Sequence, residues 1–168
     1  GGKGGIACDP QVMSSGELER LTRRFTQEMI PFIGPQVDVM APDMGTNEKV
    51  MAWMVDTWSV HAGTLEPGIV TGKPLGLFGS EGRKEATGHG VAFLSMSALE
   101  RLGIAVKGAR VVVQGFGNVG SYAARNLAAS GARVIAVGDA TGAVINERGL
   151  DIASLMKHAE TTRGVRGF

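Results

Sequence analysis

Three glycines spaced as Gly115-x-Gly117-x-x-Gly120 separate two segments with the character of buried strands, residues 109–114 and 132–137. In such a strand–turn–helix unit the first glycine permits a tight turn, the second lets a ligand approach the backbone, and the third lets the helix pack closely on the strand. The first turn of the helix also presents unpaired N–H groups, which attract phosphate. A glycine turn alone is weak evidence in a chain with 26 glycines, and a structural loop explains it as well.

The context of the turn makes the pattern specific. Asp139 ends the second strand and lies 19 residues beyond Gly120, close to the spacing of about 20 at which an acid reaches the ribose hydroxyls of a dinucleotide. A dinucleotide site is therefore predicted from the whole pattern, which consists of a strand, a turn, a helix, a second strand and an acid. A carboxylate here repels a 2′-phosphate, and no arginine follows until Arg148, so we expect a modest preference for NAD over NADP.

Two further residues have side chains suited to proton transfer. Lys3 is surrounded by glycines in Gly1-Gly-Lys-Gly-Gly5, which lets a ligand approach closely, and partial burial would disfavour its ammonium form. The alternative is an exposed lysine in a flexible loop. Asp43 precedes Gly45-Thr46-Asn47, so it could make an Asx-turn or assist a helix cap. The alternative is a proton-transfer carboxylate that projects into a cleft.

The N-terminal half is predicted to contain two amphipathic helices separated by a short strand. The first helix starts at residues 14–17 and ends near Gly34-Pro35, residues 37–41 alternate as in a strand that ends near Asp43, and Asn47 caps the second helix. The apolar positions are Leu18, Leu21, Phe25, Met29 and Phe32 in the first helix, and Val50, Met51, Met54, Val55 and Trp58 in the second.

The C-terminal half follows a segment rich in glycine and proline, residues 63–82, that has no periodic pattern and suits a crossing between domains. A helix is predicted over residues 85–102, followed by the strand–turn–helix–strand unit. Residues 142–146 suit a short strand or hairpin arm, and residues 150–159 a final helix. The first of these helices has one apolar face, formed by Val91, Leu94, Ala98 and Leu102.

Composition argues against several classes of partner. Seventeen basic and 16 acidic residues are interspersed, so neither nucleic acid nor an anionic membrane is an expected partner. Cys8 is the single cysteine, which excludes an internal disulfide, and no apolar run approaches the ~20 residues of a membrane helix, so a cytoplasmic setting is expected. His61, His89 and His158 lack the spacing of metal ligands, and no metal site is predicted.

Five motifs together resemble the glutamate dehydrogenase family, and they occur in that family's order across nearly the whole chain. They are Gly1-Gly-Lys-Gly-Gly-Ile-Ala-Cys-Asp-Pro10, Ala41-Pro-Asp-Met-Gly-Thr-Asn47, Gly68-Ile-Val-Thr-Gly-Lys-Pro74, Gly82-Arg-Lys-Glu-Ala-Thr-Gly88 and Gly115-Phe-Gly-Asn-Val-Gly120. The lysine loop and the Pro-Asp-x-Gly-Thr-Asn segment are specific, whereas many oxidoreductases share the nucleotide glycines. Leucine, phenylalanine and valine dehydrogenases share the lysine loop and the acid.

The resemblance implies roles for individual residues. Lys3 would be the catalytic lysine that activates water, and Asp43 its acid partner, which moves protons to and from the substrate nitrogen. Pro42 would border the substrate, and Thr87 would lie near the nicotinamide amide. The cofactor contacts would come from Gly115, Gly117, Asn118, Val119, Gly120 and Asp139.

The resemblance also implies an activity and an assembly. The expected reaction is the reversible oxidative deamination of L-glutamate to 2-oxoglutarate and ammonia with NAD, NADP being possible, in a homo-hexamer. The alternatives are a dehydrogenase for an apolar amino acid, or a non-catalytic dinucleotide-sensing module, which would not need Lys3 and Asp43.

The fold class expected is α/β. Residues 1–70 would be the C-terminal part of a catalytic domain, residues 71–84 an interdomain crossing, and residues 85–168 the first half of a Rossmann-like dinucleotide-binding domain. Because the chain starts without methionine and stops before a third Rossmann strand, we expect a piece of a longer parent protein that is inactive alone.

Overall fold

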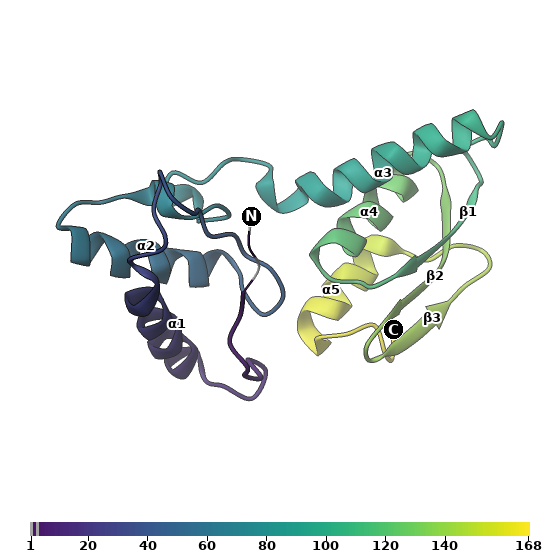
Figure 1. Cartoon of the computed structure of the whole chain (residues 1–168). Coiled ribbons are helices and arrows are strands. Elements are labelled where there is room, and N and C mark those ends of the chain that lie inside the picture. The colour runs from purple at the N-terminus through teal and green to yellow at the C-terminus, as the bar shows by residue number, and fades with distance from the viewer. Residues whose placement is uncertain (1, 3) are drawn as a thin grey trace. The chain divides into compact units, whose positions relative to one another are not determined.

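The computed structural model describes residue 2 and residues 4–168, and it has an α/β fold made of two compact units, Gly1–Arg83 and Lys84–Phe168 (Figure 1). The first unit is helical, and the second contains a small sheet with helices packed against it. The division falls at the end of the predicted crossing, where residues 63–82 form only two short 3-10 helices, η1 (Pro67–Ile69) and η2 (Leu75–Leu77).

Helix α1 spans Ser15–Met29 and starts where the sequence predicts. Ser14 Oγ accepts a hydrogen bond from the Glu17 N–H at 3.3 Å, and Glu17 Oε2 accepts one from the Ser14 N–H at 2.8 Å, which is a capping box. The predicted end near Gly34-Pro35 is wrong, because the helix gives way to turns after Met29. Phe32 is therefore exposed, and Ile33 takes the buried position instead.

Helix α2 spans Glu48–Ala62 and confirms the predicted cap. Asn47 Oδ1 accepts hydrogen bonds from the N–H groups of Lys49 and Val50 at 3.0 and 3.2 Å. At the other end Gly63 adopts the left-handed conformation, with φ of 72°. The apolar face of α2 forms most of the core of the first unit, which consists of Ile33, Val50, Met51, Trp53, Met54, Val55, Ile69 and Val70.

The strand predicted over residues 37–41 is wrong. Val37 and Val39 are exposed, and only Met40 pairs, in an isolated parallel bridge with Val70. The Met40 N–H donates to the Ile69 carbonyl at 3.0 Å, and the Thr71 N–H donates to the Met40 carbonyl at 2.7 Å. Alternation of apolar residues over so short a stretch does not make a strand without a neighbouring sheet to pair with.

The second unit contains the predicted strand–turn–helix–strand arrangement. Strands β1 (Arg110–Gln114), β2 (Arg133–Asp139) and β3 (Gly142–Ile145) lie in the order β1-β2-β3, with β1 parallel and β3 antiparallel to β2 (Figure 1). Helices α4 (Asn118–Ala129) and α5 (Ile152–Thr162) pack together against the sheet. Their shared core consists of Phe116, Ala124, Val134, Val137, Ile152, Leu155 and Val165.

Helix α3 spans Arg83–Arg101 and corrects the predicted apolar face. The expected residues, Val91, Leu94, Ala98 and Leu102, are exposed. The packed face consists of the smaller residues Gly88 and Ala92, with Ala92 in a cluster with Leu127 and Ala132. The packed face of α3 consists of small side chains because α3 crosses α4 too closely for larger ones.

The described part of the chain has neither a membrane-spanning helix nor a cluster of metal-binding side chains. In residue 2 and residues 4–168, no helix is both long and apolar enough to span a membrane. Within the same residues, no three His, Cys, Asp or Glu side chains are grouped so that they could hold a metal ion.

Candidate functional site

The three glycines of the turn between β1 and α4 differ in what a side chain would meet. Gly115 has φ of +88°, a conformation that side chains disfavour, and its N–H donates to the Gly138 carbonyl at 2.7 Å. Gly117 has open space where a Cβ would lie, whereas a Cβ on Gly120 would overlap the Gly115 carbonyl oxygen. The turn therefore needs glycine for conformation at the first position and for close packing at the third, and leaves room for a ligand at the second.

The N-terminus of α4 has the donors that an anion needs. Gly117 is its N-cap residue and, within the described residues, no side chain caps the helix. The N–H groups of the first turn, which include those of Val119 and Gly120, are left without helical partners. Their partial positive charge attracts phosphate oxygens. The turn and the helix start together fit the pyrophosphate of a dinucleotide.

The first turns of α3 pack against the N-terminus of α4. The Asn118 Nδ2 donates to the Lys84 carbonyl at 2.8 Å. One turn later, a Cβ on Gly88 would lie 2.5 Å from the Tyr122 Cβ and 2.7 Å from the Val119 carbonyl oxygen, so the two helices cross in close contact. Thr87 lies between these contacts in the sequence and is exposed. The structure therefore brings Thr87, Asn118 and Val119 to one end of the unit.

A cavity of about 250 Å³ opens beside the glycine turn, and it contains a basic residue that the sequence reasoning missed. Lys84 and Arg83 occupy the first turn of α3, where the helix dipole disfavours cations. Two basic residues at a helix start are the signal that could have identified Lys84 as a candidate site residue. The cavity is lined by Lys84, Phe116, Gly117, Asn118, Ser121, Tyr122, Met156, Ala159 and Glu160.

Asp139 ends β2 as predicted, but its carboxylate is already engaged by the protein. Oδ1 accepts hydrogen bonds from the Thr141 N–H at 2.7 Å and from the Thr141 hydroxyl at 2.6 Å, and Oδ2 accepts one from the Val165 N–H at 2.9 Å. Burial by itself raises the pKa of Asp139, but these hydrogen bonds and one from the Gly142 N–H outweigh it and hold the pKa below its ordinary value.

The lowered pKa predicts how acid affects the second unit. The stabilisation from the Asp139 carboxylate is complete above the unfolded-state value of 3.8 and is lost as the pH falls through the lower folded value. Asp139→Asn should therefore lower the urea midpoint of unfolding at pH 7, and its difference from the wild type should shrink toward pH 3. A difference that stays constant from pH 7 to pH 3 would show that the charge of Asp139 contributes nothing.

In the first unit, Asp43 lies in a turn that is closed by Thr46. The Thr46 hydroxyl accepts from the Asp43 N–H at 2.7 Å and donates to the Asp43 carbonyl at 2.8 Å. The N-cap of α2 is Asn47, as the sequence predicts, and its side chain accepts both of the capping hydrogen bonds that the structure shows there. The Asp43 side chain is exposed.

The segment that precedes Asp43 is held by the loop after α2. The Met40–Val70 bridge aligns the two stretches, and Pro42 packs on Gly72 so closely that a Cβ there would lie 2.6 Å from the Pro42 Cγ. Gly72 also has φ of +65°, and the nearby Lys73 Nζ donates to the Val70 carbonyl at 2.9 Å. These contacts fix the backbone that presents Pro42 and Asp43.

Gly72→Ala should displace that backbone. On the roles that the resemblance implies for Pro42 and Asp43, we expect turnover by a protein that contains this chain to fall by about 100-fold, the order of loss that a misplacement of about 1 Å causes. Gly63→Ala is the matched control, because Gly63 has φ of +72° but nothing within 4 Å of the added Cβ. It should lose about 1 kcal/mol of stability and keep its turnover. Equal turnover in the Gly72→Ala and Gly63→Ala variants would show that the contact between Pro42 and Gly72 is not needed for activity.

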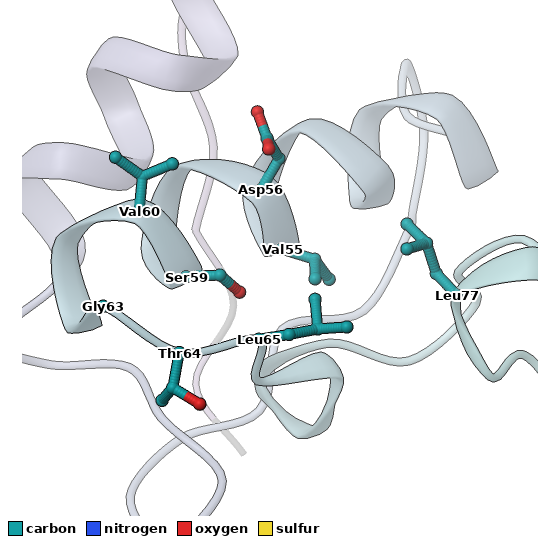
Figure 2. Close-up of a pocket in the computed structure, with 8 residues that line it drawn as sticks. All are labelled: Val55, Asp56, Ser59, Val60, Gly63, Thr64, Leu65 and Leu77. Atoms are coloured by element: carbon teal, nitrogen blue, oxygen red, sulfur yellow. The ribbon is translucent and has the colours of Figure 1, made fainter.

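A second cavity, of about 370 Å³, lies along α2 and the loop that follows it (Figure 2). The side chains of Val55, Leu65 and Leu77 are directed toward it, and the Ser59 hydroxyl accepts a hydrogen bond from the Glu66 N–H at 3.0 Å. None of the residues expected in the site lines this cavity, and we assign it no function. Lys3, the remaining expected site residue, lies outside the described residues.

Comparison with known families gives two matches. Residues 79–168 match the family described as glutamate/leucine/phenylalanine/valine dehydrogenase. Residues 1–60 match the family described as the dimerisation domain of Glu/Leu/Phe/Val dehydrogenases.

Individual relatives agree with these matches. The chain is 46% identical over 164 residues to glutamate dehydrogenase A2 of Halobacterium salinarum, an alignment that covers 98% of this chain and 39% of the relative. It is 44% identical to the hetero-hexameric glutamate dehydrogenase of Thermus thermophilus in its leucine-bound form, with a TM-score of 0.91 over 95% of this chain and 38% of that one. The Peptoniphilus asaccharolyticus glutamate dehydrogenase gives 37% identity and a TM-score of 0.72, over 94% of this chain and 41% of that one.

Proposed function

This chain belongs to the Glu/Leu/Phe/Val dehydrogenase family, and from that premise we propose that it contributes to the reversible oxidative deamination of L-glutamate by a nicotinamide dinucleotide. The products are 2-oxoglutarate and ammonia. The chain spans about two fifths of the length of the relatives it matches, so the activity proposed is that of a longer protein containing it. The observation that carries the proposal is the glycine turn in front of the uncapped N-terminus of α4.

The residues around this turn would hold the cofactor. Gly117 leaves room for the pyrophosphate, and the N–H groups of Val119 and Gly120 would donate to it. By family resemblance, Thr87 would contact the nicotinamide amide, and Asn118 would lie beside the dinucleotide. Gly115 would permit the tight turn, and Asp139 would lie beside the adenosine ribose. When bound, the dinucleotide supplies the hydride acceptor for the substrate's α-carbon.

The proton transfers are proposed for residues of the first unit. Lys3 would activate the water that adds to the iminium carbon of the oxidised substrate, and would stabilise the charge that develops. Asp43 would carry protons to and from the substrate nitrogen, which leaves as ammonia. The turn closed by Thr46 supports this role, because it fixes the Asp43 backbone while the side chain stays exposed. Pro42, held by Gly72, would border the substrate.

The second candidate is an apolar amino-acid substrate, which the family's own breadth favours. A direct test is to supply the parent with L-glutamate, L-leucine, L-phenylalanine or L-valine and to follow reduction of the cofactor. Glutamate should give the highest kcat/KM. A higher value for any of the other three would replace glutamate as the substrate, and no reduction with any of them would reject the dehydrogenase.

The assembly and location are also proposals. The hexameric state is supported by the hetero-hexameric Thermus thermophilus neighbour and by the match to a dimerisation domain, and the identity of the six subunits stays a prediction. Light scattering of the parent would measure the number of subunits. The cytoplasmic setting stays a prediction from the single cysteine.

A further inference from the structure

Met44 differs from the other methionines of this chain in its exposure to solvent. It is 100% exposed, whereas each of the others is buried or half-buried. All eight methionines lie in the described residues. A thioether that is packed among other side chains is shielded from dissolved oxidants, and an exposed thioether is not. Met44 is therefore the methionine of this chain that an oxidant in solution reaches most easily.

Met44 lies in the turn that presents Asp43. The turn comprises residues 43–46, and the Thr46 N–H donates to the Asp43 carbonyl at 3.1 Å. Gly45, the third residue of the turn, has φ of +79°, which is the conformation that a type II turn needs there. Adjacent Cα atoms are about 3.8 Å apart across a trans peptide bond, so the closed turn keeps Met44 beside Asp43.

A contact from the N-terminal segment also holds this turn. The point that a Cβ on Gly45 would occupy lies 3.3 Å from the Pro10 Cγ, so the proline ring packs on the turn. Pro10 is fixed in its own turn, in which Asp9 Oδ1 accepts a hydrogen bond from the Gln11 N–H at 2.9 Å. Because the backbone is held on both sides, only the side-chain torsions of Met44 can move its sulfur.

We propose that Met44 is a modification site, at which oxidation by hydrogen peroxide to methionine sulfoxide lowers turnover. In this step the Met44 sulfur attacks one oxygen of the peroxide, the O–O bond breaks and an S–O bond forms. The proton on the transferred oxygen passes to the departing hydroxide, which leaves as water. The sulfur is oxidised by two electrons and the peroxide is reduced by two, so no other reactant is needed.

The effect on turnover follows from the role of the neighbouring Asp43, so this inference rests on the function proposed above. A sulfoxide oxygen is polar and accepts hydrogen bonds well, whereas a thioether sulfur accepts them only weakly. Beside Asp43, the sulfoxide oxygen competes with the carboxylate for the N–H groups of the substrate nitrogen. Turnover therefore falls, whereas binding of the dinucleotide, which is proposed for the second unit, is unaffected.

Oxidation and turnover are measured on the same samples. A protein that contains this chain is treated with increasing hydrogen peroxide, peptide mass spectrometry measures the oxidised fraction of each methionine, and turnover is followed with L-glutamate. Met44 should be oxidised before the other methionines of this chain, and turnover should fall in proportion to its oxidised fraction. Methionine sulfoxide reductase should restore the lost turnover.

Two variants separate Met44 from other oxidised groups. Met44→Leu conserves the volume and removes the sulfur, so it should keep basal turnover within about twofold and resist peroxide. Met13→Leu is the matched control, because Met13 belongs to the same unit but is half-buried. It should lose turnover to peroxide as the wild type does.

Met44→Gln tests the effect of a polar acceptor without any oxidant. It should lower turnover relative to Met44→Leu and leave dinucleotide affinity unchanged, and both variants should fold normally because Met44 is fully exposed. The proposal is overturned if another methionine of this chain is oxidised before Met44, if turnover persists when Met44 is oxidised, or if Met44→Gln and Met44→Leu have equal turnover. Absence of turnover before any peroxide is added instead rejects the proposed function, and the order of oxidation still tests Met44 as the modification site.

Discussion

Lys3→Ala in the longer parent is expected to lower turnover by about 10²- to 10⁴-fold, the range that a general acid–base group contributes. Dinucleotide affinity should change little, because the cofactor would be bound by the glycine turn and α4 of the other unit. Stopped-flow turnover with L-glutamate and equilibrium titration with the dinucleotide measure the two quantities separately.

Lys49→Ala is the control for this experiment. Lys49 Nζ donates to the Ser15 hydroxyl at 2.9 Å and lies 5.2 Å from the centre of the Trp53 ring, so it has a structural environment of its own. Its replacement should cost some stability and leave turnover within about twofold. Near-normal turnover of Lys3→Ala would remove Lys3 from the mechanism and favour the exposed loop lysine.

Gly117→Ala and Gly120→Ala are expected to fail in different ways. The Gly117 variant should fold normally because the added Cβ meets nothing within 4 Å, yet it should bind the dinucleotide about 10- to 100-fold more weakly because the methyl group occupies the ligand's space. The Gly120 variant should lose about 3 kcal/mol of stability, because its Cβ meets the Gly115 carbonyl, which no side-chain rotation can move.

Urea unfolding and calorimetric titration with NADP distinguish these outcomes. If Gly117→Ala bound the dinucleotide as well as the wild type, the ligand would not approach the backbone there, and the cofactor site would have to be placed elsewhere. Gly120→Ala with wild-type stability would mean that α4 does not pack on the turn as closely as described.

The predictions that succeeded rest on local chemistry. A capping side chain followed by helical periodicity located the start of α1 and the start of α2 correctly, because both signals act within a few residues. The glycine spacing located the turn between β1 and α4, since the steric demand at each glycine comes from the turn itself.

The predictions that failed depend on contacts between distant segments. The apolar face of α3 was assigned from hydrophobicity, but the close crossing at Gly88 selects small residues, and that crossing is set by α4. Asp139 was identified correctly as the acid at the end of β2. The loop that contains Val165 and Arg166 lies more than 20 residues later, and the Val165 N–H donates to Asp139. The spacing of residues along the chain does not predict this contact.

The transfer of hydride from the α-carbon of L-glutamate is the centre of the account, and isotope labelling measures it directly. The longer parent is supplied with L-glutamate deuterated at the α-carbon and with oxidised NAD or NADP, and the reduced cofactor is analysed by mass spectrometry. We predict that the reduced cofactor gains one deuterium, that one 2-oxoglutarate and one ammonia accompany it, and that Asp43→Asn greatly slows its formation. Reduced cofactor without deuterium, or none at all in the presence of glutamate, would contradict the account.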